Sequence, residues 1–481
     1  MTTSSPTVRT RMAPSPTGDM HVGSMATLLK NYAYAKKHHG QFLLRIEDTD
    51  QVRLIEGSEE GLKQVIHDYG LDWDEGPGKD GGHGPYVQSQ RLDIYRQKAQ
   101  ELVDQNLAYY CFCSRERLEK VRVEQRAEKK PPRYDRHCLN LSEKEVSQKI
   151  DAGEKYVIRL KVPANQEVKF HDVLRGDIIV NSDEVDDQVL LKSDGFPTYH
   201  LAVVIDDHLM EISHVMRGEE WISSTPKRIL LYQAFGWTPP TYIHIPIFLN
   251  PNGKGKMSKR KGTVSARLFL DEGYLPSAML NFFMILGWTP KDQREILTLE
   301  EYVQEFDPKD ISSNSVVFDL KKLKWMNGIY IRKLTLNELN EKLTPFYPQD
   351  FPKEKVELIL PLIQERLETL SQVEELTSFF YRPIEIEPSK LLKKADSEIV
   401  ATQINQTQAT LESLTKWSIS AIETALRALQ EKNDWHRGQY FMMLRLAMTG
   451  RKVSPPLFET IHALGQKVSI ERLAKAHQLV A

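Results

Sequence analysis

The sequence predicts an α/β Rossmann-type catalytic domain that carries an inserted α+β domain and is followed by an all-α region. Three observations predict this fold class. A strand–loop–helix–strand pattern opens the chain, residues 101–187 change to charged helical stretches with short strands, and residues 329–481 are almost wholly helical in pattern. At 481 residues the chain is long enough for two to four domains.

The opening unit follows from hydrophobic periodicity. Residues 8–13 alternate as a strand does, and residues 42–46 predict the next strand. Between them the apolar residues share one helical stripe from Val22 onward: Met25, Leu28, Leu29, Tyr32 and Ala33. Gly40 is expected to end this helix in the left-handed C′ position. In a parallel sheet, ligands bind at the carboxyl ends of strands, where His21 stands.

Later segments define the remaining parts. Residues 156–160 predict a strand in the insertion, and residues 198–205 and 242–249 predict strands after the α/β pattern resumes near Val189. The division that follows is a first catalytic half (1–100), an insertion (101–188), a second catalytic half (189–250), a lysine-loop region (251–324) and a helical region (325–481) with a possible split near 382.

Composition narrows the class of protein. The net charge is −2, from 64 basic and 66 acidic side chains, so the sum neither supports nor excludes nucleic-acid binding. Three cysteines are too few for a disulfide framework. No apolar run approaches the length of a membrane span, and the polar N-terminus predicts no secretory signal. We expect a cytoplasmic enzyme with no membrane partner.

Two short segments carry the chemistry. The first, residues 14–24, offers an imidazole at a helix N-terminus, where a phosphate is favoured, beside glycines that permit close backbone approach. Its expected ATP-binding residues are Thr17, Gly18, His21, Gly23 and Ser24. The second, residues 256–260, follows a turn-forming stretch and presents Lys256, Ser258 and Lys259 to the phosphates. The catalytic candidates are His21, Lys256 and Lys259.

Several segments together resemble a known family. They are residues 7–24, 44–50, 190–202, 217–221, 256–260, 324–328, 449–450 and 454–459, and they span nearly the whole chain. This pattern is similar to the glutamyl/glutaminyl branch of class I aminoacyl-tRNA synthetases, of bacterial glutamyl type. The resemblance implies ATP with Mg²⁺, L-glutamate and tRNA(Glu) as partners, a glutamyl-adenylate intermediate, and a monomer. It also implies that the insertion binds the tRNA acceptor end and that the helical region binds the anticodon.

The resemblance also implies an amino-acid pocket. Glu47 would bind the α-ammonium with Ser15 nearby, Arg217 would bind the α-carboxylate, and Arg11 and Tyr199 would read the side-chain carboxylate. A buried arginine favours glutamate over neutral glutamine, because an amide cannot balance its charge. Val203 stands where the family is expected to have asparagine.

The cysteines and one arginine complete the candidate sites. Cys111, Cys113 and Cys138 have the short spacing of a structural zinc site, and Asn140 stands where a histidine ligand is expected. Tyr134 or His137 would then have to be the fourth ligand; the alternative is a vestigial site with free thiols. Residues 115–136 hold nine basic and five acidic side chains, a candidate footprint for the tRNA acceptor end. The resemblance implies that Arg366 senses the third anticodon base; the alternative is a surface arginine with no ligand.

Four other activities would share parts of this sequence pattern. A non-discriminating enzyme would charge tRNA(Gln) as well, and the sequence leaves that open. A glutaminyl-tRNA synthetase would have a β-barrel C-terminal part, whereas residues 414–480 are helical in pattern. A truncated paralogue would lack the helical region. A non-catalytic RNA-binding derivative is disfavoured by the retained His21, Lys256 and Lys259.

Overall fold

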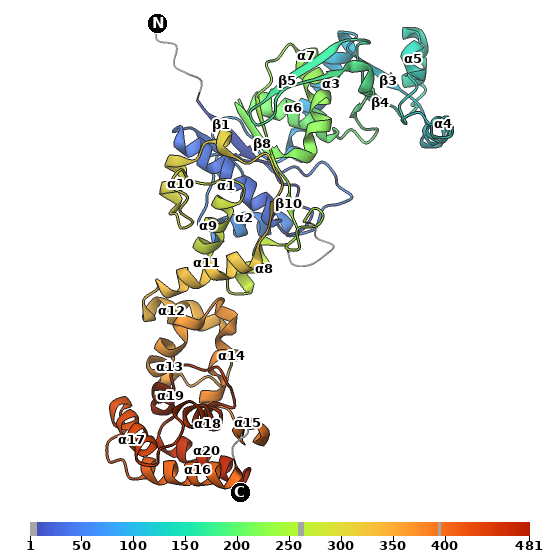
Figure 1. Cartoon of the computed structure of the whole chain (residues 1–481). Helices are drawn as coiled ribbons and strands as arrows, with labels where there is room; N and C mark the ends of the chain where they lie inside the picture. Colours follow the sequence, from blue (N-terminus) through green and yellow to red (C-terminus); the bar gives the residue numbers. More distant parts are fainter. Residues whose placement is uncertain (1–6, 258–263, 393–395) are drawn as a thin grey trace. The chain divides into compact units, whose positions relative to one another are not determined.

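The computed structural model describes residues 7–257, 264–392 and 396–481. The chain forms two compact units (Figure 1). The first runs to Phe269 and takes in Met279–Leu320, and the second comprises Leu270–Ala278 and Lys321–Ala481. The finer sequence-based division of the first unit into two catalytic halves and an insertion stays a prediction.

The first unit is a mixture of short strands and helices. Its strands are β1 (Arg9–Met12), β2 (Gln41–Leu44), β3 (Ala108–Cys111), β4 (Val157–Leu160), β5 (Glu167–Asp172), β6 (Gly176–Asn181), β7 (Val189–Leu191), β8 (His214–Gly218), β9 (Thr241–Ile245), β10 (Phe248–Leu249) and β11 (Val316–Val317). Its helices are α1 (Val22–Lys37), α2 (Ser58–Asp68), α3 (Leu92–Asp104), α4 (Arg115–Ala127), α5 (Glu143–Asp151), α6 (Tyr199–Leu209), α7 (Thr225–Phe235) and α10 (Leu299–Glu305). The chain passes between the units within α8 (Ala266–Asp271) and α9 (Pro276–Ile285).

The predicted opening unit is confirmed. β1 and β2 pair in parallel from Arg9 opposite Gln41 to Met12 opposite Leu44, with α1 between them in the chain. β8 and β9 are also parallel and belong to a sheet of order β6-β5-β9-β8, whereas β3, β4 and β7 form a separate antiparallel sheet. β9 and β10 confirm the strand expected over 242–249, with a break at Pro246.

The predicted role of Gly40 is wrong. The left-handed residue after α1 is His39, with φ of 51°, while the Gly40 amide donates to the Ala35 carbonyl at 2.8 Å. A Cβ on Gly40 would lie 1.9 Å from the Val8 carbonyl oxygen. Glycine is needed here because the start of β2 lies against the segment before β1.

The strand predicted over 198–205 is also wrong, because these residues begin α6. Leu201 to Asp207 are all buried, and a helix that is buried on every side has the same continuous apolar pattern as a buried strand. Thr198 precedes the helix in an extended conformation, and no glycine or proline interrupts the eleven residues of α6. This correction matters for the site, since Tyr199 and Asp207 lie two turns apart on one helix face.

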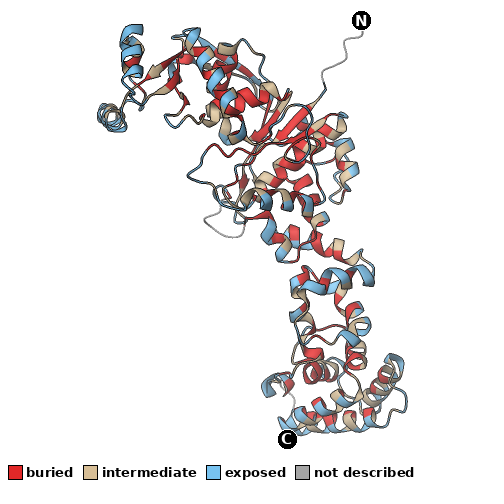
Figure 2. Ribbon diagram, turned by 180° about the vertical axis from the view of Figure 1, so that it is seen from behind, coloured by how far each residue is buried: buried red, intermediate tan, exposed pale blue. Residues whose placement is uncertain are grey.

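The second unit is helical, as predicted. Its helices are α11 (Leu320–Arg332, of which Leu320 belongs to the first unit), α12 (Leu336–Leu343), α13 (Val356–Ile363), α14 (Val373–Thr377), α15 (Pro388–Leu392), α16 (Ser397–Glu412), α17 (Ile419–Lys432), α18 (Arg437–Thr449), α19 (Leu457–Leu464) and α20 (Gln466–Gln478). They bury a continuous apolar core, shown by the red inward faces of these helices in Figure 2. Among the described residues, no helix combines the length and apolar character needed to cross a membrane.

Candidate active site

A cavity of about 730 Å³ lies at the carboxyl ends of β1 and β8. Most of the predicted site residues line it: Arg11, Ser15, His21, Gly23, Ser24, Glu47, Tyr199, Arg217 and Lys256. Thr17 and Gly18 are outside its lining. Ser258 and Lys259 lie outside the described residues. The cavity therefore gathers residues from widely separated segments, as the motifs predicted.

One end of the cavity is built on the start of α1. His21 is the N-cap residue of that helix, and its Nδ1 accepts a hydrogen bond from the Gly23 amide at 2.9 Å. This bond places the proton of a neutral imidazole on Nε2. A Cβ on Gly23 would lie 3.0 Å from His21 Nδ1, so glycine is also what permits the cap.

Arg217 is held by a chain of buried side chains. It lies on β8 directly opposite His244 of β9, and its Nε donates to His244 Nε2 at 3.0 Å. His244 Nδ1 in turn donates to Asp172 at 2.7 Å, and Arg217 Nη2 donates to Thr225 at 2.7 Å. The remaining nitrogen, Nη1, is buried and has no hydrogen-bond partner among the described residues. Arg217 thus lines the cavity with an unsatisfied donor.

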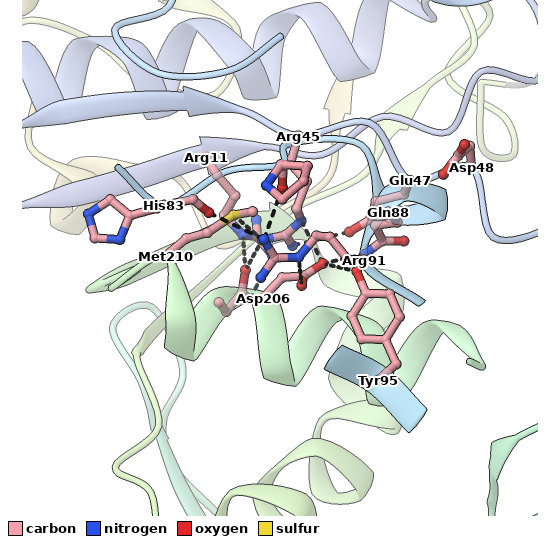
Figure 3. A network of polar contacts seen from close by, with 12 residues as sticks. Arg11, Arg45, Glu47, Asp48, His83, Gln88, Arg91, Tyr95, Asp206 and Met210 are labelled. Atoms are coloured by element: carbon pink, nitrogen blue, oxygen red, sulfur yellow. Dashed lines mark hydrogen bonds and ion pairs between the residues drawn. The ribbon is translucent and has the colours of Figure 1, made fainter. Parts of the chain in front are cut away.

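A second group of arginines is fully paired with acids, and we call it the balanced cluster: Arg11, Arg45, Arg91, Glu47, Asp206 and Asp207. Arg45 is completely buried and contacts Asp207 at 2.9 Å, Glu47 at 3.2 Å and Asp206 at 3.7 Å (Figure 3). Arg11 pairs with Asp207 at 3.1 Å, and Arg91 pairs with Asp206 at 2.8 Å. The charges of its three arginines and three acids can therefore cancel.

Burial and charge act in opposite directions on the acids of this cluster. Burial alone would raise the pKa of Asp207, but Arg11 and Arg45 outweigh it and hold that pKa below its ordinary value. Burial raises the pKa of Glu47, and the partly offsetting charges are those of Arg45 and Arg11. Tyr95 donates to Asp206 at 2.8 Å and Gln88 does so at 2.9 Å, so this carboxylate is well satisfied.

The sequence reasoning missed Arg45, Asp206 and Asp207. Arg45 was not among the predicted site residues, and it is completely buried. The two aspartates were missed because residues 198–205 were read as a strand. Read as a helix, Tyr199 to Asp207 have the spacing i, i+4, i+7 and i+8, which places Val203, Asp206 and Asp207 on the face of Tyr199.

The lysine of the second motif is held by an acid. Lys256 Nζ donates to Glu220 at 2.8 Å, and its backbone forms a bridge with Leu249. Both charged side chains are about half exposed. Such a pair contributes little to stability, so Lys256 can exchange Glu220 for a phosphate at small cost.

The cysteines gather beside the antiparallel sheet. The Cys113 and Cys138 sulfurs lie 3.4 Å apart, and all three sulfurs lie within 4.8 Å of one another. The Tyr134 hydroxyl lies 3.3 Å from Cys111 Sγ and 3.4 Å from Cys113 Sγ. Of the two candidate fourth ligands, Tyr134 is the one with its oxygen among the sulfurs.

Two further predicted residues are placed differently. Val203 is 1% exposed, belongs to the apolar core of α6 and does not line the cavity. Arg366 ends a short 3₁₀ turn in the second unit and is exposed. Its charge, together with burial, lowers the pKa of the nearby Arg445. Two arginines therefore lie close together on this part of the helical unit.

Comparison with protein families now defines the class. The family described as the catalytic domain of class I tRNA synthetases for glutamate and glutamine matches residues 7–325. The anticodon-binding domain family matches residues 338–477. The chain is a class I aminoacyl-tRNA synthetase, as its fold and cavity indicated.

Individual relatives narrow the class. A glutamate–tRNA ligase of Dehalococcoides mccartyi is 43% identical over 479 residues, which cover 98% of this chain and 97% of the relative. The ligase of Acidothermus cellulolyticus is 44% identical, with 98% and 95% covered. A crystal structure of a glutamate–tRNA ligase from Elizabethkingia meningosepticum in complex with its amino acid superposes with a TM-score of 0.90 at 34% identity, covering 99% of this chain and all of that one. The chain belongs to the glutamate–tRNA ligase family.

Proposed function

We propose that this chain activates L-glutamate with MgATP to glutamyl-adenylate and pyrophosphate, and then transfers glutamate to the terminal adenosine of tRNA(Glu). The observation that carries the proposal is the single cavity that joins the His21 helix start to Arg217 and Glu47. The reaction needs no covalent enzyme intermediate, so positioning and charge stabilisation supply the catalysis.

The amino-acid end binds by charge complementarity. Arg217 Nη1, a buried donor without a partner among the described residues, receives the α-carboxylate. Glu47 receives the α-ammonium with Ser15 beside it. Arg11 and Tyr199, which line the same cavity, receive the side-chain carboxylate.

The ATP end uses the two motifs. His21 donates from Nε2 to a phosphate oxygen, because its Nδ1 is occupied by the Gly23 amide. Thr17, Gly18, Gly23 and Ser24 form the loop around the nucleotide. Lys256 leaves Glu220 to neutralise the phosphates, and Ser258 and Lys259 join it there.

The tRNA contacts follow the family pattern. The insertion, residues 101–188, binds the acceptor end with the basic stretch that includes α4. The helical region, residues 325–481, binds the anticodon, and the exposed Arg366 donates to its third base. No described contact favours or disfavours tRNA(Gln) as a second substrate.

Pyrophosphate exchange with purified protein tests the activity. We expect exchange that depends on glutamate and tRNA(Glu), is not supported by glutamine, and falls at least 100-fold in Lys259→Ala. Exchange supported by glutamine alone would refute the assignment. Charging of tRNA(Glu) and tRNA(Gln) by wild type and Arg366→Gln tests the anticodon contact, with Arg427→Gln on α17 as the control.

We further propose one structural Zn²⁺, bound by Cys111, Cys113, Cys138 and Tyr134. Tetrahedral zinc–thiolate bonds of about 2.3 Å place sulfurs about 3.8 Å apart, which the observed sulfur separations can meet with small shifts. When bound, the ion ties β3 to the segment around Cys138. Mass-spectrometric metal analysis should find one zinc per chain in wild type and none in Cys138→Ser. A metal-free wild type after incubation with zinc would exclude the site.

A further inference from the structure

Arg228 on α7 is a buried cation that nothing in the described structure neutralises. Its side chain is 2% exposed, and Nε, Nη1 and Nη2 all lack a hydrogen-bond partner among the described residues. No ion pair within the described ranges includes it. A buried charge that is neither paired nor hydrogen-bonded is strongly unfavourable, so a side chain of this kind is expected to have a compensating role.

Among the described residues, the favourable contacts of the Arg228 guanidinium are with two aromatic rings. The Arg228 guanidinium lies 5.0 Å from the centre of the Tyr199 ring and 5.2 Å from that of Trp221. The two rings are themselves in contact, with centres 4.9 Å apart, and both line the cavity. Cation–π contacts offset only part of the cost of burying a guanidinium. The positive charge that these contacts leave uncompensated can therefore act on a ligand bound on the cavity side of Tyr199.

Among the charges that act on the Tyr199 hydroxyl, Arg228 is the largest, ahead of Glu47, Arg11 and Asp207. In the balanced cluster the charge of Arg11 is matched by Asp207, so Arg11 adds little net positive potential to the cavity. His200, beside Tyr199, does not carry charge: burial first, and then Arg228, lower its pKa to about 3. Burial raises the pKa of the Tyr199 hydroxyl, and Arg228 is the largest charge that opposes this.

We propose that Arg228 is a specificity-determining positioning residue whose uncompensated charge, acting through the Tyr199 and Trp221 rings, makes the Tyr199 hydroxyl favour an anionic carboxylate over a neutral amide. This inference rests on the proposed function and deepens it: Arg228 selects glutamate over glutamine without touching either. Arg217 and Arg228 are hereafter called the open cations.

A purely structural role would give a different outcome. An arginine that stabilises the packing of α7 would lower stability when replaced by an apolar side chain. A functional, uncompensated cation has the opposite signature, because replacing a buried charge by an apolar group of similar length removes a desolvation cost. Stability and substrate affinity should therefore move in opposite directions.

The test compares Arg228→Met with Arg228→Lys, and uses Lys227→Met as a neighbouring charge removal that is not stacked on the rings. Thermal unfolding is measured together with calorimetric binding of glutamate and glutamine and with the KM for glutamate and ATP in tRNA charging. Arg228→Met should keep or raise the melting temperature, raise the glutamate dissociation constant and KM about tenfold or more, narrow the preference over glutamine, and leave the ATP KM unchanged. Arg228→Lys should retain most of the preference, and Lys227→Met all of it.

Three outcomes would overturn the inference: unchanged glutamate affinity in a folded Arg228→Met, loss of stability in that variant, or equal weakening of glutamate and glutamine. Failure of the proposed function gives a different result. A wild type that binds glutamate by calorimetry but does not charge tRNA would refute the proposed activity, while the ratio of the two binding constants would still decide the role of Arg228.

Discussion

The two sets of arginines around the cavity differ in how their charge is balanced. In the balanced cluster, every arginine has a buried acid within ion-pair distance, for example Arg45 with Asp207 at 2.9 Å. The open cations, Arg217 and Arg228, have no acid in direct contact within the described parts of the chain. Nη1 of Arg217 and all three side-chain nitrogens of Arg228 are buried without a hydrogen-bond partner among the described residues. The difference indicates that the first set builds the site, whereas Arg217 is completed by direct contact with substrate and Arg228 acts on substrate through the Tyr199 ring.

The largest expected effect is in the balanced cluster. Asp207→Asn removes the charge that pairs with both Arg11 and Arg45 and leaves two buried guanidinium groups without it. We expect a loss of about 3–5 kcal/mol in the free energy of unfolding, measured by urea titration. Asp194→Asn is the matched control, because its ion pair with Lys192 is about half exposed and its loss should change stability by at most about 0.5 kcal/mol. Equal losses in the two variants would mean that burial of the cluster is not what matters.

The second-largest expected effect distinguishes Arg217, one of the open cations, from the balanced cluster. Arg217→Met should raise the KM for glutamate about 30-fold, since a charge-assisted hydrogen bond contributes about 2 kcal/mol. The ATP KM should stay within about twofold, and the free energy of unfolding should change far less than in Asp207→Asn. Steady-state charging kinetics and urea titration measure both. A large stability loss with normal glutamate KM would place Arg217 with the structural arginines.

A smaller effect on the glutamate KM is expected for His244, which contacts Arg217 and not the substrate. His244→Leu removes the acceptor that orients Arg217 Nε, and it removes the side-chain donor to Asp172, which keeps its backbone donors. The glutamate KM should rise about 5–10-fold with kcat little changed, because the arginine remains but is less well oriented. His244→Gln, which keeps an acceptor, should recover part of the affinity. If both variants bind glutamate normally, Arg217 is positioned by Thr225 and the sheet alone.

The smallest expected effect is a change in the free energy of unfolding at acid pH, and it depends on Asp172. Burial would raise the pKa of Asp172, but its hydrogen bonds with His244 and two backbone amides hold that pKa below 3.8. Its stabilisation is therefore complete above the ordinary value and is lost as pH falls through the lowered, folded value. The difference in unfolding free energy between wild type and Asp172→Asn should be constant from about pH 7 to 5 and should shrink below pH 3.8. A difference that shrinks already near neutral pH would contradict this.

The same contrast explains what the sequence could and could not predict. Side chains that face substrate follow short, recognisable motifs, so Arg11, His21, Glu47 and Arg217 were predicted and do line one cavity. The residues behind them depend on three-dimensional packing. Asp207 was missed because an apolar run buried on all sides fits a strand and a helix equally well.

Arg228 shows a second limit of sequence reasoning. It stands within the apolar run of α7, where nothing in the local pattern distinguishes a buried arginine from one that extends to solvent. Gly40 shows a third limit. Glycine is required there because a Cβ would clash with the Val8 carbonyl oxygen, and not because of the helix that precedes it. In each case a distant segment decides the role of the residue.

A crystal structure of this protein with bound glutamate tests most directly whether Arg217 is completed by substrate and whether Arg228 acts on substrate through Tyr199. The predicted result is one carboxylate within about 3.2 Å of Arg217 Nη1 and the other within hydrogen-bond distance of the Tyr199 hydroxyl, with the Arg11–Asp207 pair intact. Glutamate bound with Arg217 Nη1 still unpartnered, or with Arg11 drawn away from Asp207 to bind both carboxylates, would contradict it.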